Sequence, residues 1–211
     1  MDEVNMSPAL LLDFISSLFK SYEHEKISDY IINKTTELKE NGEKNSLATS
    51  MILFHALLKN YSPWFIAHID KFREHLSLLD MQDPFACFNF CKLALDFPHY
   101  FGYDICDFGR VIKITTQLLI SDKSYLRCLA SAALNALLKT AKSSTKGITF
   151  PLIELAENIN EDIIGNYLIA VANAMKLEAD FTQEEIVSIA EFAVPLLADE
   201  ELDIVNGAIR I

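Results

Sequence analysis

The chain of 211 residues has the composition of a folded protein: 51% of its residues are hydrophobic, 23% are charged, and glycine and proline number only six each. Such a chain buries a sizeable core in one domain or two small ones. Its net charge of −12 opposes an approach to nucleic-acid phosphates, and its longest nearly apolar run, 163–175, is too short to cross a bilayer. Because the N-terminus is acidic where a secretory signal is basic, the expected location is cytoplasmic or nuclear.

Helix-start signals recur along the chain. Ser7-Pro8, Ser62-Pro63 and Asp83-Pro84 each place a capping side chain before a proline at the first helical position. The segment from Thr182 to Glu185 has the pattern of a capping box. No stretch alternates as a strand does, so the expected fold class is all-α with no sheet. Apolar residues three and four apart predict about eleven helices, at 8–20, 25–39, 46–60, 63–79, 84–97, 107–120, 123–142, 149–158, 162–178, 183–197 and 200–211.

A repeat of 38 residues emerges when the second half of the chain is superposed on itself. At this offset Ala132 falls on Ala170, and Asn135 falls on Asn173. Units of two helices with such a period are typical of helical solenoids, in which each unit buries its core only by stacking on the next.

The residues around these asparagines resemble those of the armadillo and HEAT families. Segments 132–136 and 170–174 resemble the Ala-x-x-Asn-apolar core of the last helix of an armadillo repeat, and 122–130 resembles the second helix of a HEAT unit. The resemblance implies a right-handed α-solenoid of helical hairpins, forming one domain over 1–211. Its repeats are recognisable over 83–211, where the last one ends in mid-pattern, and the helical part at 1–82 is divergent.

The resemblance also implies a binding site. In armadillo proteins the repeated asparagine often points into a concave groove and bonds the backbone of an extended peptide, which makes Asn135 and Asn173 candidate partner-binding residues. Tyr125, Arg127 and Lys92 are expected on or near the phase-matched helices, so we add them as candidate contacts to a peptide or an acidic patch. The alternative for these three residues is ordinary surface or inter-repeat contact.

A narrower resemblance covers residues 85–98. This segment is similar to the stretch Phe-Pro-x-Leu-Asp-x-x-Arg-Leu of the PUL domain, with Ala86 in place of the family's proline and Lys92 in place of its arginine. The PUL domain is an armadillo-type module that binds the C-terminal tail of the valosin-containing AAA ATPase in ubiquitin handling. The resemblance implies a docking charge on Lys92 and on the basic residues of 110–150.

Charge is distributed unevenly along the chain. Residues 1–109 hold 16 acids and nine bases, residues 110–150 hold seven bases and one acid, and residues 151–211 hold 13 acids and two bases. This basic band between acidic ends consists either of solvated helix faces or of a docking surface for a partner of complementary charge.

Enzyme signatures are absent from the sequence. It contains no Gly-x-Ser-x-Gly, no Gly-rich phosphate loop and no His-Glu-x-x-His. The pairs Cys87/Cys91 and His68/His75 lack further ligands at suitable spacing, so neither a metal nor another cofactor is expected. We therefore expect a non-enzymatic adaptor or scaffold that binds a protein segment on the groove formed by the second helices of its repeats. The alternative is a structural subunit or fragment of a large assembly, which contacts its neighbours through its convex face and open ends.

Overall fold

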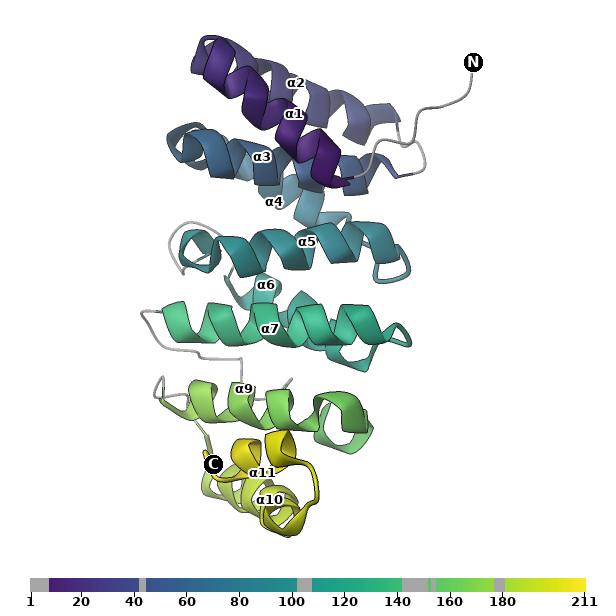
Figure 1. The fold of residues 1–211 in the computed structure, drawn as a ribbon, viewed down its shortest axis with the longest axis vertical. Coiled ribbons are helices and arrows are strands. Elements are labelled where there is room, and N and C mark those ends of the chain that lie inside the picture. The colour runs from purple at the N-terminus through teal and green to yellow at the C-terminus, as the bar shows by residue number, and fades with distance from the viewer. Residues whose placement is uncertain (1–7, 42–44, 102–107, 142–151, 153–154, 177–180) are drawn as a thin grey trace. The chain divides into compact units, whose positions relative to one another are not determined.

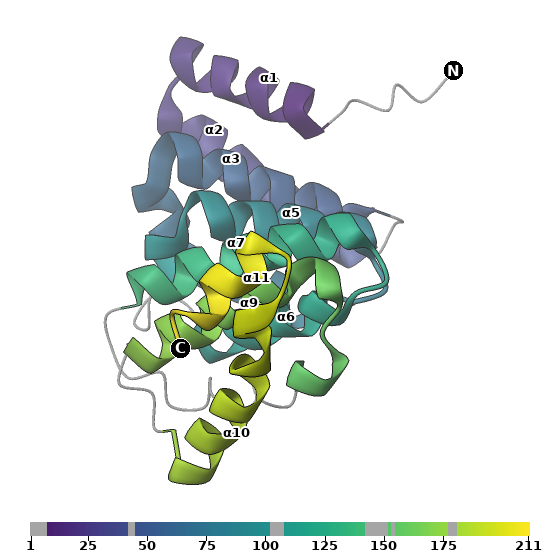
Figure 2. The same ribbon diagram turned by 60° about the horizontal axis from the view of Figure 1, so that its bottom comes forward.

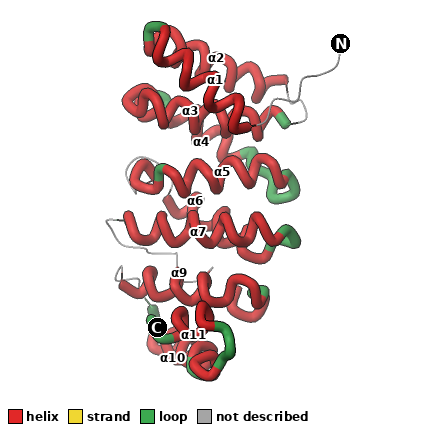
Figure 3. Tube along the Cα trace, viewed as in Figure 1, coloured by secondary structure: helices red, strands yellow, loops and turns green. Residues whose placement is uncertain are grey.

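The computed structural model describes residues 8–41, 45–101, 108–141, 152, 155–176 and 181–211. These residues form helices, turns and loops, and none of them lies in a strand (Figure 3). The expected all-α fold without a sheet is confirmed for this part of the chain. The chain divides into two compact units, Met1–Leu93 and Ala94–Ile211, which we describe in turn.

Unit 1 is built around one long buried helix. It contains α1 (Pro8–Ser21), α2 (His24–Asn41), α3 (Ser46–Ala67), α4 (Ile69–Ser77) and most of α5 (Pro84–Asp96). Every residue from Met51 to Leu58 in α3 is buried, because α1, α2 and α4 all pack against this helix. The core of unit 1 therefore lies along α3 (Figure 1).

Helix α3 bends at Tyr61, whose φ of −153° and ψ of 68° are not helical. The expected helix start at Ser62-Pro63 follows directly, and a proline costs little there because its missing N–H falls in the first turn of the new segment. The helix expected at 63–79 is interrupted at His68, whose φ is −117°, and resumes as α4. The start expected at Asp83-Pro84 is confirmed, since Asp83 Oδ1 accepts hydrogen bonds from the backbone N–H groups of Phe85 and Ala86, both at 3.0 Å.

Unit 2 contains the rest of α5 and the helices that carry the predicted repeat. Its α-helices agree with the expected ranges to within a few residues, whereas most of the helix expected at 149–158 lies outside the described residues. In chain order its further elements are η1 (Pro98–Phe101), α6 (Phe108–Gln117), η2 (Leu118–Ile120), α7 (Ser124–Thr140), η3 (Ala156–Asn158), η4 (Glu161–Ile163), α9 (Ile164–Lys176), α10 (Gln183–Ala193), η5 (Pro195–Ala198) and α11 (Leu202–Ala208).

Three helices of unit 2 form a layer. Helix α7 packs against α9, and α9 packs against α11, while α6 and η2 pack on α7 (Figure 1). The apolar stripe of α7, which includes Leu126, Ala130 and Leu134, is buried by these neighbours. In Figure 2, α10 extends away from this layer.

Candidate functional site

Asn135 and Asn173 meet where α7 packs on α9. Asn173 Nδ2 donates a hydrogen bond to Asn135 Oδ1 at 3.1 Å, and Asn135 Nδ2 donates to the backbone oxygen of Asn166 at 3.3 Å. Asn135 is buried, while Asn173 is half-buried. The structure thus brings the two predicted asparagines together, and the amide of Asn135 links the two helices instead of facing solvent.

Arg127 also joins two elements of unit 2. Its Nε lies 3.1 Å from Asp162 Oδ1 and its Nη2 lies 2.6 Å from Asp162 Oδ2, while its Nη1 donates to the backbone oxygen of Ser121 at 2.7 Å. The side chain is 12% exposed. Hydrogen bonding to Asp162 raises the pKa of Arg127, which stays cationic. Asp162 was not among the predicted residues, because no local pattern shows which acid in a later element an arginine will reach.

The other two candidates are exposed. Tyr125 lies on α7 with 48% of its surface exposed, and Lys92 is exposed on the part of α5 that belongs to unit 1. Four of the five predicted residues therefore lie in unit 2, around α7 and α9, and the fifth lies in unit 1.

Exposed side chains of α7 and α9, together with the half-buried Asn173, define what we call the α7–α9 face. The Asn135–Asn173 hydrogen bond aligns equivalent positions of the two helices, so Lys139 and Lys176 both lie at the C-terminal ends of this face, where the helix dipole favours cations. The face is polar and made of mostly short side chains between its ends. Its members are Tyr125, Cys128, Ala132, Lys139, Asn166, Asn173 and Lys176.

Two glycines let α9 and α11 touch through their backbones. A Cβ atom on Gly165 would collide with the backbone carbonyl of Asp203, and one on Gly207 would lie 2.7 Å from the carbonyl oxygen of Gly165. Neither Gly165 nor Gly207 was among the predicted residues. The signal in the sequence is that both fall on the packed side of an expected helix, where a close approach of two backbones needs a residue without a side chain.

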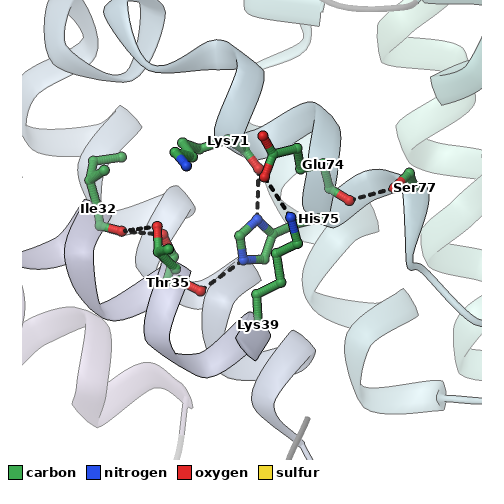
Figure 4. Close-up of polar contacts among 8 residues, drawn as sticks. Ile32, Thr35, Lys39, Lys71, Glu74, His75 and Ser77 are labelled. Carbon is green, nitrogen blue, oxygen red and sulfur yellow. Dashed lines mark hydrogen bonds and ion pairs between the residues drawn. The ribbon is translucent and has the colours of Figure 1, made fainter. Parts of the chain in front are cut away.

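The histidines considered as metal ligands have other contacts. His75 is buried in α4, with Nδ1 2.6 Å from the backbone oxygen of Lys71 and Nε2 2.9 Å from that of Thr35 in α2 (Figure 4). His68 Nδ1 lies 2.9 Å from the backbone oxygen of Trp64. His75 therefore joins α2 to α4.

An ion pair lies beside this buried histidine. Lys39 Nζ of α2 is 2.6 Å from Glu74 Oε2 of α4, and the hydrogen bond to Lys39 lowers the pKa of Glu74 (Figure 4). Both side chains are partly exposed to solvent, so we assign the pair a small share of the α2–α4 contact.

Cys87 and Cys91, four residues apart in α5, are buried free thiols. Burial raises the pKa of Cys87 to about 12, with the carboxylates of Asp83 and Asp80 adding to the effect, and it raises the pKa of Cys91 as well. Metal binding requires the thiolate form, which these environments disfavour. Among the described residues, no group of three or more His, Cys, Asp or Glu side chains is placed to hold a metal ion.

Comparison with models of known protein families, with curated proteins and with solved structures finds no match. Within the described ranges, no helix combines the length and the apolar character that a membrane span requires. The protein's function is therefore inferred from the chemistry of its own surfaces.

Proposed function

We propose that this protein is a non-enzymatic protein–protein interaction module, an adaptor or scaffold built from armadillo- or HEAT-like helical hairpins. The observation that carries the proposal is a constant interval between contacting residues. Asn135 bonds Asn173 across α7 and α9, and Gly165 lies against the backbone of Asp203 across α9 and α11, in each case 38 residues along the chain. Helices stacked at a constant interval are what solenoid proteins use to form extended binding surfaces.

The α7–α9 face is the binding surface in this proposal. Asn173 uses one N–H in its bond to Asn135, and its carbonyl oxygen has no hydrogen-bond partner among the described residues. An amide with a remaining donor and acceptor suits the backbone of an extended peptide. Lys139 and Lys176 add two positive charges at one edge, so the preferred segment carries acidic residues there.

The links that α7 makes to η4 and to α9 prepare this face for binding. Arg127 holds Asp162 through two hydrogen bonds, and Asn135 holds both Asn173 and the backbone of Asn166. Side chains that are already ordered lose less conformational freedom when a partner binds. Asn135 and Arg127 thus act as positioning residues, and Tyr125 and Asn173 make the contacts.

Affinity capture with matched variants tests the proposal. The native chain, a Tyr125→Ala/Asn173→Ala variant and a Tyr30→Ala control would be used as baits in cytoplasmic and nuclear extracts, with quantitative mass spectrometry. Tyr30 is 67% exposed and lies in unit 1. We expect partners that the double variant loses and the control retains. Partners retained by all three baits would instead indicate a structural subunit that uses other surfaces.

A second candidate function rests on the exposed side of α5. Phe85 and Phe88 are 64% and 37% exposed, and with Lys92 they follow a spacing of three and four residues that places them on one helix face. Two aromatic rings beside a cation suit a short tail with apolar and acidic residues. This favours the PUL-like function, binding of the C-terminal tail of the valosin-containing AAA ATPase.

That candidate is tested by titrating a fluorescent peptide of the ATPase tail into the native chain. Binding that Phe85→Ala and Lys92→Glu each weaken, and Tyr30→Ala does not, would support it. An absence of binding to the native chain would contradict the PUL-like function and leave the α7–α9 proposal unaffected.

A further inference from the structure

Helix α10 has apolar residues on its buried side and also on a side that is exposed to solvent. On its packed side Ile189 and Ala193 are buried, and the ring of Phe192 meets Tyr167 edge-on at 6.0 Å between centroids. Further apolar residues face solvent: Ile186, Val187, Val194 and Leu197 are 43%, 49%, 61% and 48% exposed. A helix packed on one side needs a single apolar stripe, so a second, exposed one indicates an interaction surface.

These exposed residues follow one stripe along α10 and η5. Val194 keeps helical dihedrals, with φ of −59° and ψ of −45°, so η5 continues the direction of α10. At about 100° per residue, the exposed apolar positions fall within an arc of about 100° beside the buried side. We call this set the α10 stripe, and it consists of Ile186, Val187, Ala190, Val194 and Leu197.

Acidic side chains border the α10 stripe. Glu184 and Glu191 line a cleft of about 750 Å³ together with Val187, which belongs to both the cleft and the stripe. Neither glutamate forms an ion pair within the described part of the chain. Past Leu197 the chain continues with further acids, so that residues 181–211 hold seven acids and one base. The stripe thus lies in a strongly negative surrounding.

We propose that the α10 stripe and its acidic cleft bind an amphipathic helix of a partner protein, with apolar residues every three or four positions and Lys or Arg along its edge. The apolar residues of such a helix would cover the stripe, as in other helix-in-groove complexes, and its basic edge would lie against Glu184 and Glu191. A second copy of this chain is a poor occupant, because a two-fold contact would place these glutamates opposite one another.

This surface is separate from the α7–α9 face, so its test uses other variants. The probe is a fluorescent peptide of about 18 residues with leucine at helical spacing and lysine on both edges. A shuffled peptide of the same composition controls for charge alone. Binding would be measured by fluorescence anisotropy at low and high salt, and mapped by amide chemical shifts on α10, η5 and α11.

Two variants and a matched control test whether the peptide binds the α10 stripe and its acidic cleft. Val187→Ser/Val194→Ser removes apolar surface that is already exposed, and we expect it to weaken peptide binding at least tenfold with an unchanged melting temperature. Glu184→Gln/Glu191→Gln is expected to weaken binding at low salt and to flatten its salt dependence. Leu78→Ser, at a residue that is 52% exposed in unit 1, should leave binding unchanged.

Four results would overturn the inference. The first is that the shuffled peptide binds as tightly as the amphipathic one, which would reduce the effect to charge alone. The second is that the native chain binds neither peptide. The third is that the double serine variant binds as the native chain does. The fourth is a concentration-dependent dimer of the native chain that the double serine variant abolishes, because a second copy would then occupy the stripe.

Discussion

Asn173 lies 38 residues after Asn135 and donates a hydrogen bond to its side-chain oxygen at 3.1 Å. The interval at which the two residues recur in the sequence is therefore also the interval at which they touch. This bond helps to hold the α7–α9 face together.

Replacing Asn135 is expected to destabilise unit 2 more than replacing Asn173. In Asn135→Ala a buried donor and acceptor are removed, and Asn173 loses its partner, at a cost of about 1–3 kcal/mol in the free energy of unfolding. Asn173→Ala leaves Asn135 its bond to Asn166, and water can replace the lost donor to Asn135 Oδ1 because Asn173 is only half-buried, so we expect about 1 kcal/mol. Chemical denaturation measures both, with the exposed Asn206→Ala as a control. Equal, negligible effects would contradict the structural role of Asn135.

Adding a methyl group between α9 and α11 is expected to be costly. Gly207→Ala places a Cβ against the backbone of Gly165, so we expect the free energy of unfolding to fall by about 2–3 kcal/mol. Gly109→Ala is the matched control, because Gly109 is exposed on α6 and alanine favours helix there. Thermal and urea unfolding would measure the stability of both variants. A Gly207→Ala protein as stable as the control would mean that α9 and α11 can move apart.

The link between Arg127 and Asp162 is expected to depend on the planar guanidinium. Arg127→Lys keeps the charge and loses the paired geometry, for a loss of about 1 kcal/mol, since Asp162 is 39% exposed and partly screened by solvent. A double-mutant cycle with Asp162→Asn measures the coupling between the two side chains. No measurable coupling would place Arg127 among ordinary surface residues, and would free it for contact with a partner.

Stability is expected to decline in alkali because of the buried thiols of α5. Burial raises the pKa of Cys87 to about 12 from its ordinary value of about 9, and raises that of Cys91 too. Between these values the unfolded chain loses protons that the folded chain keeps, so the free energy of unfolding falls as the pH rises above about 9. A Cys87→Ala/Cys91→Val variant should show a shallower decline.

A thiol reagent gives a second measurement of the same environment. At pH 8 the exposed Cys128 should react at once, whereas Cys87 and Cys91 should react only as fast as the unit unfolds. Rapid reaction of either α5 thiol would contradict their burial.

Local chemistry made much of the fold predictable. The capping box at Thr182 is confirmed, with Thr182 Oγ1 accepting from the Glu185 N–H at 3.2 Å and Glu185 Oε2 accepting from the Thr182 N–H at 2.7 Å. Such bonds join residues three apart in the chain, so both partners can be recognised within one short stretch of sequence. The same holds for Asp83 and, through hydrophobic periodicity, for the buried stripe of α7.

The candidate site was less predictable, because its contacts cross between helices. Periodicity places Asn135 near the edge of a stripe, but whether that edge is covered depends on how closely α9 approaches. Likewise, the carboxylates of Asp122 and Asp162 both act on the charge of Arg127, and the path of the chain through η4 decides that Asp162 is the one it bonds. The exposure of Tyr125 agrees with its expected position, while its contact with a partner stays a prediction.

The glycine contact between α9 and α11 also affects the mechanics of unit 2. Where two helices touch backbone to backbone, there are no side chains whose rotamers could absorb a change in the angle between them. Helix α7, by contrast, is bridged by rotatable side chains to the elements that follow it, through Arg127 to η4 and through Asn135 to α9. We therefore expect a partner that bends this unit to change the angle between α7 and α9, while α9 and α11 move together as one rigid body.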